Sequence, residues 1–200
     1  MGKRSSYLDI VLNPFNLLRT KRILHVNPTA VPQRTEPDHI NLYVYDYDAE
    51  NLYEEKLKEV KDAFRYKHSS SVTWINVDGI RRKDIEEICQ HFSVHPLVME
   101  DIMSIGQRPK MDEIDGVIFC LLNMLYFNEK DSAVETEQIS IVLGKQFVLS
   151  FQEDASRDVF NPLRDKIQFR NNKLRQSGTD YLFYALIDLI VDNYFVVMEK

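Results

Sequence analysis

The sequence has little cysteine, glycine or proline, and each scarcity excludes a class of protein. Two cysteines among 200 residues are too few for a disulfide-bonded secreted scaffold. Cys89 and Cys120 stand in apolar surroundings and outside any Cys-x-x-Cys pair, so we expect two buried, reduced thiols. Six glycines and seven prolines exclude a linker-like or collagen-like chain. With 44% hydrophobic residues, the chain can bury a sizeable core.

An excess of positive charge is also missing. The formal net charge is −6, which argues against broad binding to nucleic acid. Residues 1–22 hold five basic side chains and one acidic side chain, so the rest of the chain is more acidic still. Such a body suits a cation as its partner better than a phosphate. The N-terminus has no apolar segment of the signal-peptide type.

Motifs of nucleophilic or phosphate-transfer chemistry are absent too. The sequence contains no Gly-x-Ser-x-Gly, no glycine-rich phosphate loop and no kinase signature. His91 and His95 are four residues apart and could hold zinc on a helix, but Pro96 pushes His95 out of helical geometry. We expect a surface histidine and a helix cap there instead. The chain is therefore predicted not to be an enzyme.

Hydrophobic patterning predicts interspersed strands and helices. Strands are expected at residues 39–47, 72–77, 117–127, 138–143 and 146–151. Helices are expected at residues 52–64, 83–92, from Pro96 onward, at about 158–170 and at 179–200. Gly144-Lys145 predicts a two-residue type II′ hairpin between the last two strands. The fold class is α/β or α+β, with a mixed, partly antiparallel sheet covered by helices.

The last predicted helix contains an apolar stretch, residues 181–198, nearly long enough to span a membrane. Asp188 and Asp192 interrupt it, and each would cost about 3 kcal/mol at a membrane centre, so a buried soluble helix is predicted. The two carboxylates share a helix face, where like charges repel. A compensating partner is therefore expected: solvent, a basic neighbour such as Arg164 or Lys166, or a metal ion.

Glu100 and Asp101 fall in the first turns after Pro96. Carboxylates there complement the positive end of a helix, which is the favoured interpretation on local grounds. The alternative is an acidic pair available to a hard cation, which takes oxygen ligands. The nearby segment Gln-Arg-Pro-Lys at residues 107–110 is expected to form a fixed turn with two exposed bases.

Several of these segments form a recognisable series. They are TWINVDGI at 73–80, HPLVMEDI at 95–102, QRPK at 107–110, EQIS at 137–140, FQE at 151–153, and DYL through DNYF at 180–195. In this order they resemble the cytoplasmic domain of CorA-type magnesium transporters, over about residues 39–200. No motif covers residues 1–38.

The resemblance implies a three-layer α/β/α sandwich whose last helix begins a long stalk leading to the membrane. It divides the chain into a basic, irregular leader at 1–38, a regulatory domain at 39–178 and the beginning of the stalk at 179–200. It also implies a homopentamer around one pore in the cell membrane, with this domain in the cytoplasm. The pore helices and the family's Gly-Met-Asn signature are missing from this stretch, so we expect no transport by it alone.

In the family, intracellular Mg²⁺ binds between neighbouring cytoplasmic domains and holds the pore closed. The resemblance places Asp101, beside Glu100, at the interfacial metal position, and Asp188 at a second acidic position. Mg²⁺ is thus the expected regulatory ligand, with Ca²⁺ or Co²⁺ as its substitutes. Two alternatives stay open: the domain of a related zinc transporter, and a stand-alone cytosolic metal-binding or interaction protein.

Overall fold

The computed structural model describes residues 35–130, 132–154 and 157–200; expectations for residues 1–34 lie outside this part of the chain. The strands are β1 Asn41–Tyr47, β2 Leu52–Leu57, β3 Val72–Asp78, β4 Lys110–Ile114, β5 Val117–Asn128, β6 Ala133–Leu143 and β7 Phe147–Gln152. The helices are the 3₁₀ helix η2 Val60–His68, α2 Arg82–His91, α3 Pro96–Met103, α4 Asn161–Gln168, α5 Lys173–Gln176 and α6 Thr179–Met198.

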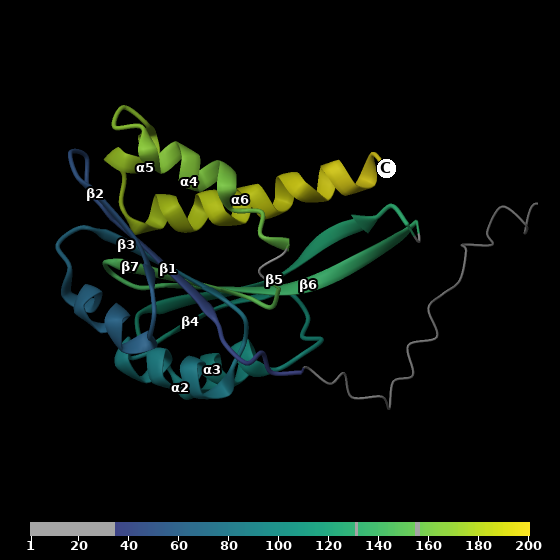
Figure 1. Ribbon diagram of the computed structural model, residues 1–200, viewed down its shortest axis with the longest axis horizontal. Coiled ribbons are helices and arrows are strands. Elements are labelled where there is room, and N and C mark those ends of the chain that lie inside the picture. Colours follow the sequence, from purple (N-terminus) through teal and green to yellow (C-terminus); the bar gives the residue numbers. More distant parts are fainter. Residues whose placement is uncertain (1–34, 131, 155–156) are drawn as a thin grey trace, which may run out of the picture. The chain divides into compact units, whose positions relative to one another are not determined.

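The strands form one sheet in the order β2-β1-β3-β7-β6-β5-β4. Only the central neighbours β3 and β7 are parallel among the described pairs, and the other pairs are antiparallel. Helices η2, α2 and α3 cover one face, and α4, α5 and α6 cover the other (Figure 1). The predicted α/β/α sandwich with a mixed, partly antiparallel sheet is confirmed.

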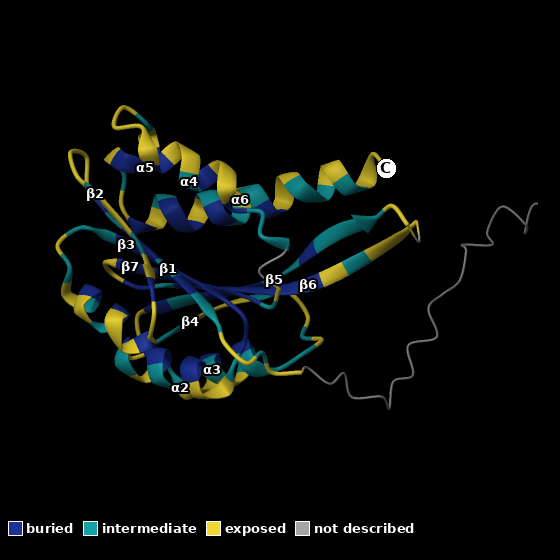
Figure 2. Ribbon diagram, in the orientation of Figure 1, coloured by how far each residue is buried: buried dark blue, intermediate teal, exposed yellow. Residues whose placement is uncertain are grey.

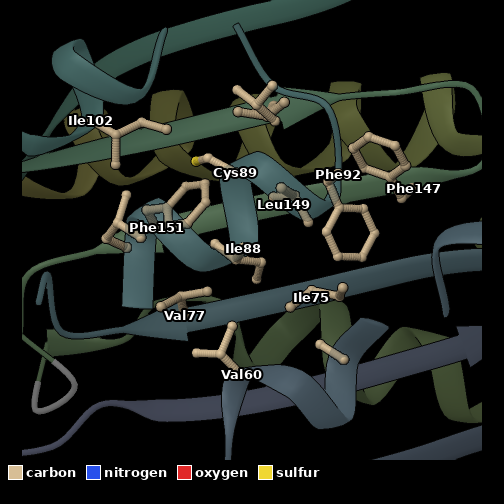
Figure 3. Close-up of a cluster of buried hydrophobic side chains, with 14 of the residues drawn as sticks. Val60, Ile75, Val77, Ile88, Cys89, Phe92, Ile102, Phe147, Leu149 and Phe151 are labelled. Carbon is tan, nitrogen blue, oxygen red and sulfur yellow. The ribbon is translucent and has the colours of Figure 1, made fainter. Parts of the chain in front are cut away.

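Each sheet face has its own hydrophobic core, because successive strand residues point to opposite faces. On the first face, Ile75 and Val77 of β3 pack under Ile88 and Cys89 of α2 (Figure 3). Both cysteines are buried and free, as predicted. Burial raises the pKa of Cys89 to about 12 and that of Cys120 to about 11, so both remain neutral thiols.

The second core holds α6 against the sheet. Leu182, Leu186 and Ile190 recur every fourth residue and are fully buried, whereas apolar side chains such as Phe195 and Val196 in the last turns are exposed (Figure 2). Helix α6 is long enough and apolar enough to cross a membrane, judged by its length and composition alone. The predicted burial therefore holds for its first turns and not for its last ones.

Polar side chains then tie the end of α6 to β5. Asn193 Nδ2 donates to the carbonyl oxygen of Leu125 at 2.6 Å, and the Tyr194 hydroxyl donates to the carbonyl oxygen of Asn123. Strand β4 pairs only with residues 117–121 of β5, so these carbonyls lie past its end. Side chains of α6 thus donate hydrogen bonds to backbone carbonyls of β5 at a sheet edge that β4 does not cover.

The prediction of one helix or two short ones at residues 52–64 was wrong for residues 52–57, which form a strand, and holds from Val60, where a 3₁₀ helix begins. Asp48 Oδ1 accepts hydrogen bonds from the backbone N–H groups of Glu50 and Asn51 and reverses the chain, so residues 52–57 return as β2 alongside β1. Glu and Lys favour helix locally, but here they occupy an exposed edge strand, where charged side chains discourage further pairing. Helical structure begins only at Val60.

The turn type predicted at Gly144 was also wrong. The antiparallel hairpin between β6 and β7 is present as predicted, but Gly144 N–H donates to the Phe147 carbonyl at 2.8 Å. The residues that reverse the chain are therefore Lys145 and Gln146, and not Gly144 and Lys145. Gly144 does not have the positive φ that a type II′ turn requires. Glycine is needed there for space, since a Cβ atom would lie 2.3 Å from the Phe147 ring.

We predict that Gly144→Ala lowers the free energy of unfolding by about 1–3 kcal/mol, because the added methyl group overpacks against the Phe147 ring. Urea denaturation would measure the loss. In a Phe147→Leu background the smaller side chain removes the clash, so the same alanine should cost clearly less. An equal cost in both backgrounds would show that backbone conformation, and not the ring, demands glycine.

Candidate metal-binding site

Three of the motif segments meet around Asp101, in the last turn of α3. Lys110, the first residue of β4, places its Nζ 2.6 Å from Asp101 Oδ2. Gln138 of β6 donates through Nε2 to the main-chain oxygens of Asp101, at 3.2 Å, and Ser104, at 2.9 Å. Residues 95–102, 107–110 and 137–140 thus form one junction, in which the sheet fixes the end of α3.

The start of α3 follows from its sequence. His95 is the N-cap and its Nδ1 accepts from the backbone N–H of Leu97 at 3.1 Å, while Pro96 occupies the first turn. Val98 and Ile102, four residues apart, are buried and hold the helix on the sheet. The predicted histidine cap is confirmed.

The His91 side chain packs against Phe64 of η2. Its ring stacks on Phe64 with centroids 3.8 Å apart, and its Nε2 lies 3.1 Å from the Phe64 carbonyl oxygen. The ring is therefore a packing element between α2 and η2.

The interpretation of Glu100 and Asp101 as N-terminal helix charges was wrong. Helix α3 ends at Met103, so both residues lie in its second half, and the first turn contains no acidic residue. A carboxylate in the last turn faces the negative end of the helix dipole and is disfavoured without a cation nearby. Lys110 supplies that cation. It was expected as an exposed base in a turn, but it opens β4 and is half-buried, whereas Arg108 is exposed as expected.

Glu100 does not share this environment. It is exposed, and adjacent helix positions do not face each other, so Glu100 and Asp101 do not converge on one ion within the helix.

Asp188 lies on the other side of the sheet, on α6. It is exposed, and the Tyr184 hydroxyl donates to its Oδ1 at 3.1 Å. With Asp192, Lys166 and Lys173 it lines a cleft of about 370 Å³. Solvent therefore provides the compensation expected for the aspartate pair, and the two lysines add positive charge to the same cleft.

Arg164, the other basic residue expected to balance the Asp188–Asp192 pair, has different partners. It pairs with Asp158 and lies over the rings of Tyr43, Tyr45 and Trp74. In the described residues, no group of three or more His, Cys, Asp or Glu side chains could hold a metal ion. A single chain also keeps Asp101 and Asp188 apart, on opposite faces of the sheet.

The family model for CorA-like Mg²⁺ transporter proteins matches residues 69–200, which include Asp101, Lys110, Gln138 and Asp188. This chain belongs to the CorA-like Mg²⁺ transporter family. It is 38% identical over 164 residues to the cobalt/magnesium transport protein CorA of Thermotoga maritima, a match that covers 82% of this chain and 46% of that protein. The chain thus spans about half the length of this curated relative.

Solved CorA structures share the fold. The soluble domain of CorA from Methanocaldococcus jannaschii superposes with a TM-score of 0.57 at 15% identity, covering 83% of this chain and 61% of that one. The complete CorA magnesium transporter from the same organism gives a TM-score of 0.55 at 14% identity, covering 79% of this chain and 46% of that one. The predicted family and fold class are confirmed.

Sequence reasoning missed the roles of Lys110 and Gln138. Both stand in CorA-like motifs. Their spacing in the sequence does not show that the first residue of β4, Lys110, and a buried residue of β6, Gln138, will contact the end of α3. The one available signal was polarity, since Gln138 is a polar residue directly before the mostly apolar segment 139–143, and the structure shows that it is buried.

A second polar cluster lies between β3, β7 and the α4 layer. Trp74 Nε1 donates to Ser150 Oγ at 2.9 Å, Ser150 Oγ donates to Asn76 Oδ1 at 2.7 Å, and Asn76 Nδ2 donates to Asp78 Oδ1 at 2.6 Å. Asp78 is only 4% exposed. Burial, reinforced by the negative charge of Asp158, raises the pKa of Asp78 to about 6.

This raised pKa predicts a pH dependence of stability. The folded state holds the Asp78 proton more tightly than the unfolded chain, so the free energy of unfolding should fall as pH rises from about 4 to 6. The full penalty at pH 7 is about 3 kcal/mol. Asp78→Asn should remove this slope and raise stability at pH 7, as measured by urea denaturation between pH 4 and 7. The exposed Asp112→Asn variant should keep the wild-type slope. A wild-type slope in Asp78→Asn would place the titrating group elsewhere.

Proposed function

We propose that this chain is the Mg²⁺-sensing regulatory domain of a CorA-type divalent-cation transporter, closing the pore when Mg²⁺ fills sites between neighbouring subunits. The observation that supports this most is the position of Asp101. It is a partly exposed carboxylate (22% side-chain exposure) in the last turn of α3, fixed by β6 and balanced by one lysine.

The donor set fits Mg²⁺. This ion prefers oxygen ligands, keeps several waters and usually takes one or two protein carboxylates. Asp101 offers one carboxylate, and Glu100 faces another direction. No described cluster within one chain completes a site. The remaining ligands therefore come from a second copy of the chain, and Ca²⁺ or Co²⁺ can take the place of Mg²⁺ at oxygen ligands.

The two-faced arrangement also favours a ring. Asp101 and Asp188 lie on opposite faces of the sheet, so one copy presents them to two different neighbours. A contact between unlike faces is heterologous, and such contacts close into a ring when the rotation allows it. The proposed assembly is the homopentamer of the family, with this domain on the cytoplasmic side of the cell membrane.

In this assembly the carboxylates of adjoining copies repel each other. Bound Mg²⁺ supplies positive charge between them, so filling the sites tightens the ring and emptying them loosens it. By thermodynamic linkage, whatever opens the ring must also weaken Mg²⁺ binding. The domain acts through binding alone, and we assign no catalytic step to it.

The first test of this proposal is protease protection of the full-length transporter. Wild type should become resistant to chymotrypsin as Mg²⁺ rises, and Asp101→Ala should need at least about fivefold more Mg²⁺, since coupling energies between sites typically correspond to 5–150-fold. Asp112→Ala, which removes an exposed charge from β4, should behave as wild type. Equal midpoints for Asp101→Ala and wild type would mean that Asp101 is not a ligand.

A second test uses residues 1–200 alone. Because the proposed sites need two copies, this chain should be monomeric or weakly associated and should bind Mg²⁺ only in the millimolar range or not detectably. Sedimentation velocity and calorimetric titration measure these properties. Tight, stoichiometric Mg²⁺ binding to the monomer would contradict the intersubunit site.

A further inference from the structure

The ion pair between Asp101 and Lys110 bears on how the proposed site is regulated, and the following inference rests on the function proposed above. We propose that Lys110 is an internal counter-ion of Asp101, which a divalent cation must displace in order to bind. Lys110 would then set the Mg²⁺ concentration at which the site fills.

The pair is preformed and not a chance contact of two mobile side chains. Asp101 belongs to α3, whose last turn Gln138 holds from β6, and Lys110 begins β4, which pairs with β5 through Leu121. Lys110 Nζ and Asp101 Oδ2 are 2.6 Å apart, and the two side chains keep 33% and 22% exposure. Both charges are thus held by regular structure at the rim of the domain, with solvent on one side.

The position of Asp101 makes a cation necessary. Its carboxylate adds to the negative end of the α3 dipole, so an empty site without a counter-ion would destabilise this turn. Among the described residues, Lys110 is the side chain that donates to this carboxylate. The empty site is therefore already neutralised, and the domain can lose its metal without losing local structure.

Mg²⁺ and the lysine compete for the same carboxylate. Lys110 occupies Oδ2, and a Mg²⁺ ion bound to either oxygen at about 2.0–2.1 Å would stand close to the ammonium group. Three positive charges would then lie around one carboxylate, and their repulsion disfavours binding of both cations at once. The flexible four-carbon stem of lysine lets the ammonium group swing into solvent. Binding is then an exchange of lysine for Mg²⁺. The apparent affinity for Mg²⁺ equals the intrinsic affinity multiplied by the fraction of sites from which the lysine is absent.

The experiment is the Mg²⁺ midpoint of chymotrypsin protection in the full-length protein, measured for Lys110→Met. The thioether keeps the length of the side chain and removes its charge. We expect the midpoint to fall about three- to fivefold, which corresponds to the upper end of the free energies measured for exposed ion pairs. Lys110→Gln should shift it in the same direction, which guards against a packing effect of either replacement.

Two controls separate exchange from general electrostatics. Arg108→Met removes an exposed positive charge two residues away and should leave the midpoint within about twofold, because exposed charges are screened. In an Asp101→Asn background, Lys110→Met should have no effect. A fall in midpoint that persists in this background, or that Arg108→Met reproduces, would overturn the counter-ion assignment.

The same variants distinguish the two proposals. If Asp101→Asn raises the midpoint but Lys110→Met leaves it unchanged or raises it, Asp101 is a ligand and the lysine is not its competitor. If Asp101→Asn has the wild-type midpoint, the proposed metal site itself is wrong, and the counter-ion assignment falls with it.

Discussion

The parallel pairing of β3 and β7 at the centre of the sheet is the constraint on which the other parts of the domain depend. It joins two antiparallel halves, β2-β1-β3 and β7-β6-β5-β4, that are separated in sequence by α2 and α3. Those two helices lie on one face of the sheet, and the helices that follow β7 lie on the other. Asp101 and Asp188 consequently stand on opposite sides of the molecule. The separation of the two acidic positions is thus a property of the chain's topology.

The two acidic positions are balanced by different physical means. Asp188 is exposed, accepts a hydrogen bond from Tyr184 and shares a cleft with two lysines, so water screens most of its charge. Asp101 lies in a less exposed place at the end of a helix and depends on a specific partner, Lys110. This difference in environment supports Asp101 over Asp188 as the sensing position in the proposed function.

Sequence reasoning succeeded where local pattern and tertiary structure agree. The β-branched and aromatic residues of β3, the amphipathic pattern of α2, the proline start of α3 and the apolar face of α6 all follow from local propensity, periodicity and capping. It failed at residues 52–57, where a partner strand overrides helix propensity. The candidate site shows the same limit: Asp101 was predicted as a metal ligand only through resemblance to a family, while local rules gave a helix cap because the length of α3 was unknown. Its contact with Lys110 depends on where β4 begins, which no local pattern contains.

The second polar cluster, formed by Trp74, Ser150, Asn76 and Asp78, bears on both the register of the sheet and the position of Asp101. It spans the β3–β7 seam, with Asn76 directly opposite Ser150. A shift of β3 by one residue would turn Asn76 and Asp78 into the hydrophobic core under α2 and leave their partners unsatisfied, at a cost of about 1–3 kcal/mol for each buried group. Apolar residues alone penalise such a shift weakly in a strand buried on both faces, because both faces accept them. The destabilising Asp78 carboxylate thus has a specific effect: it fixes the register of the strand pair that keeps α3, and with it Asp101, on its own face of the sheet.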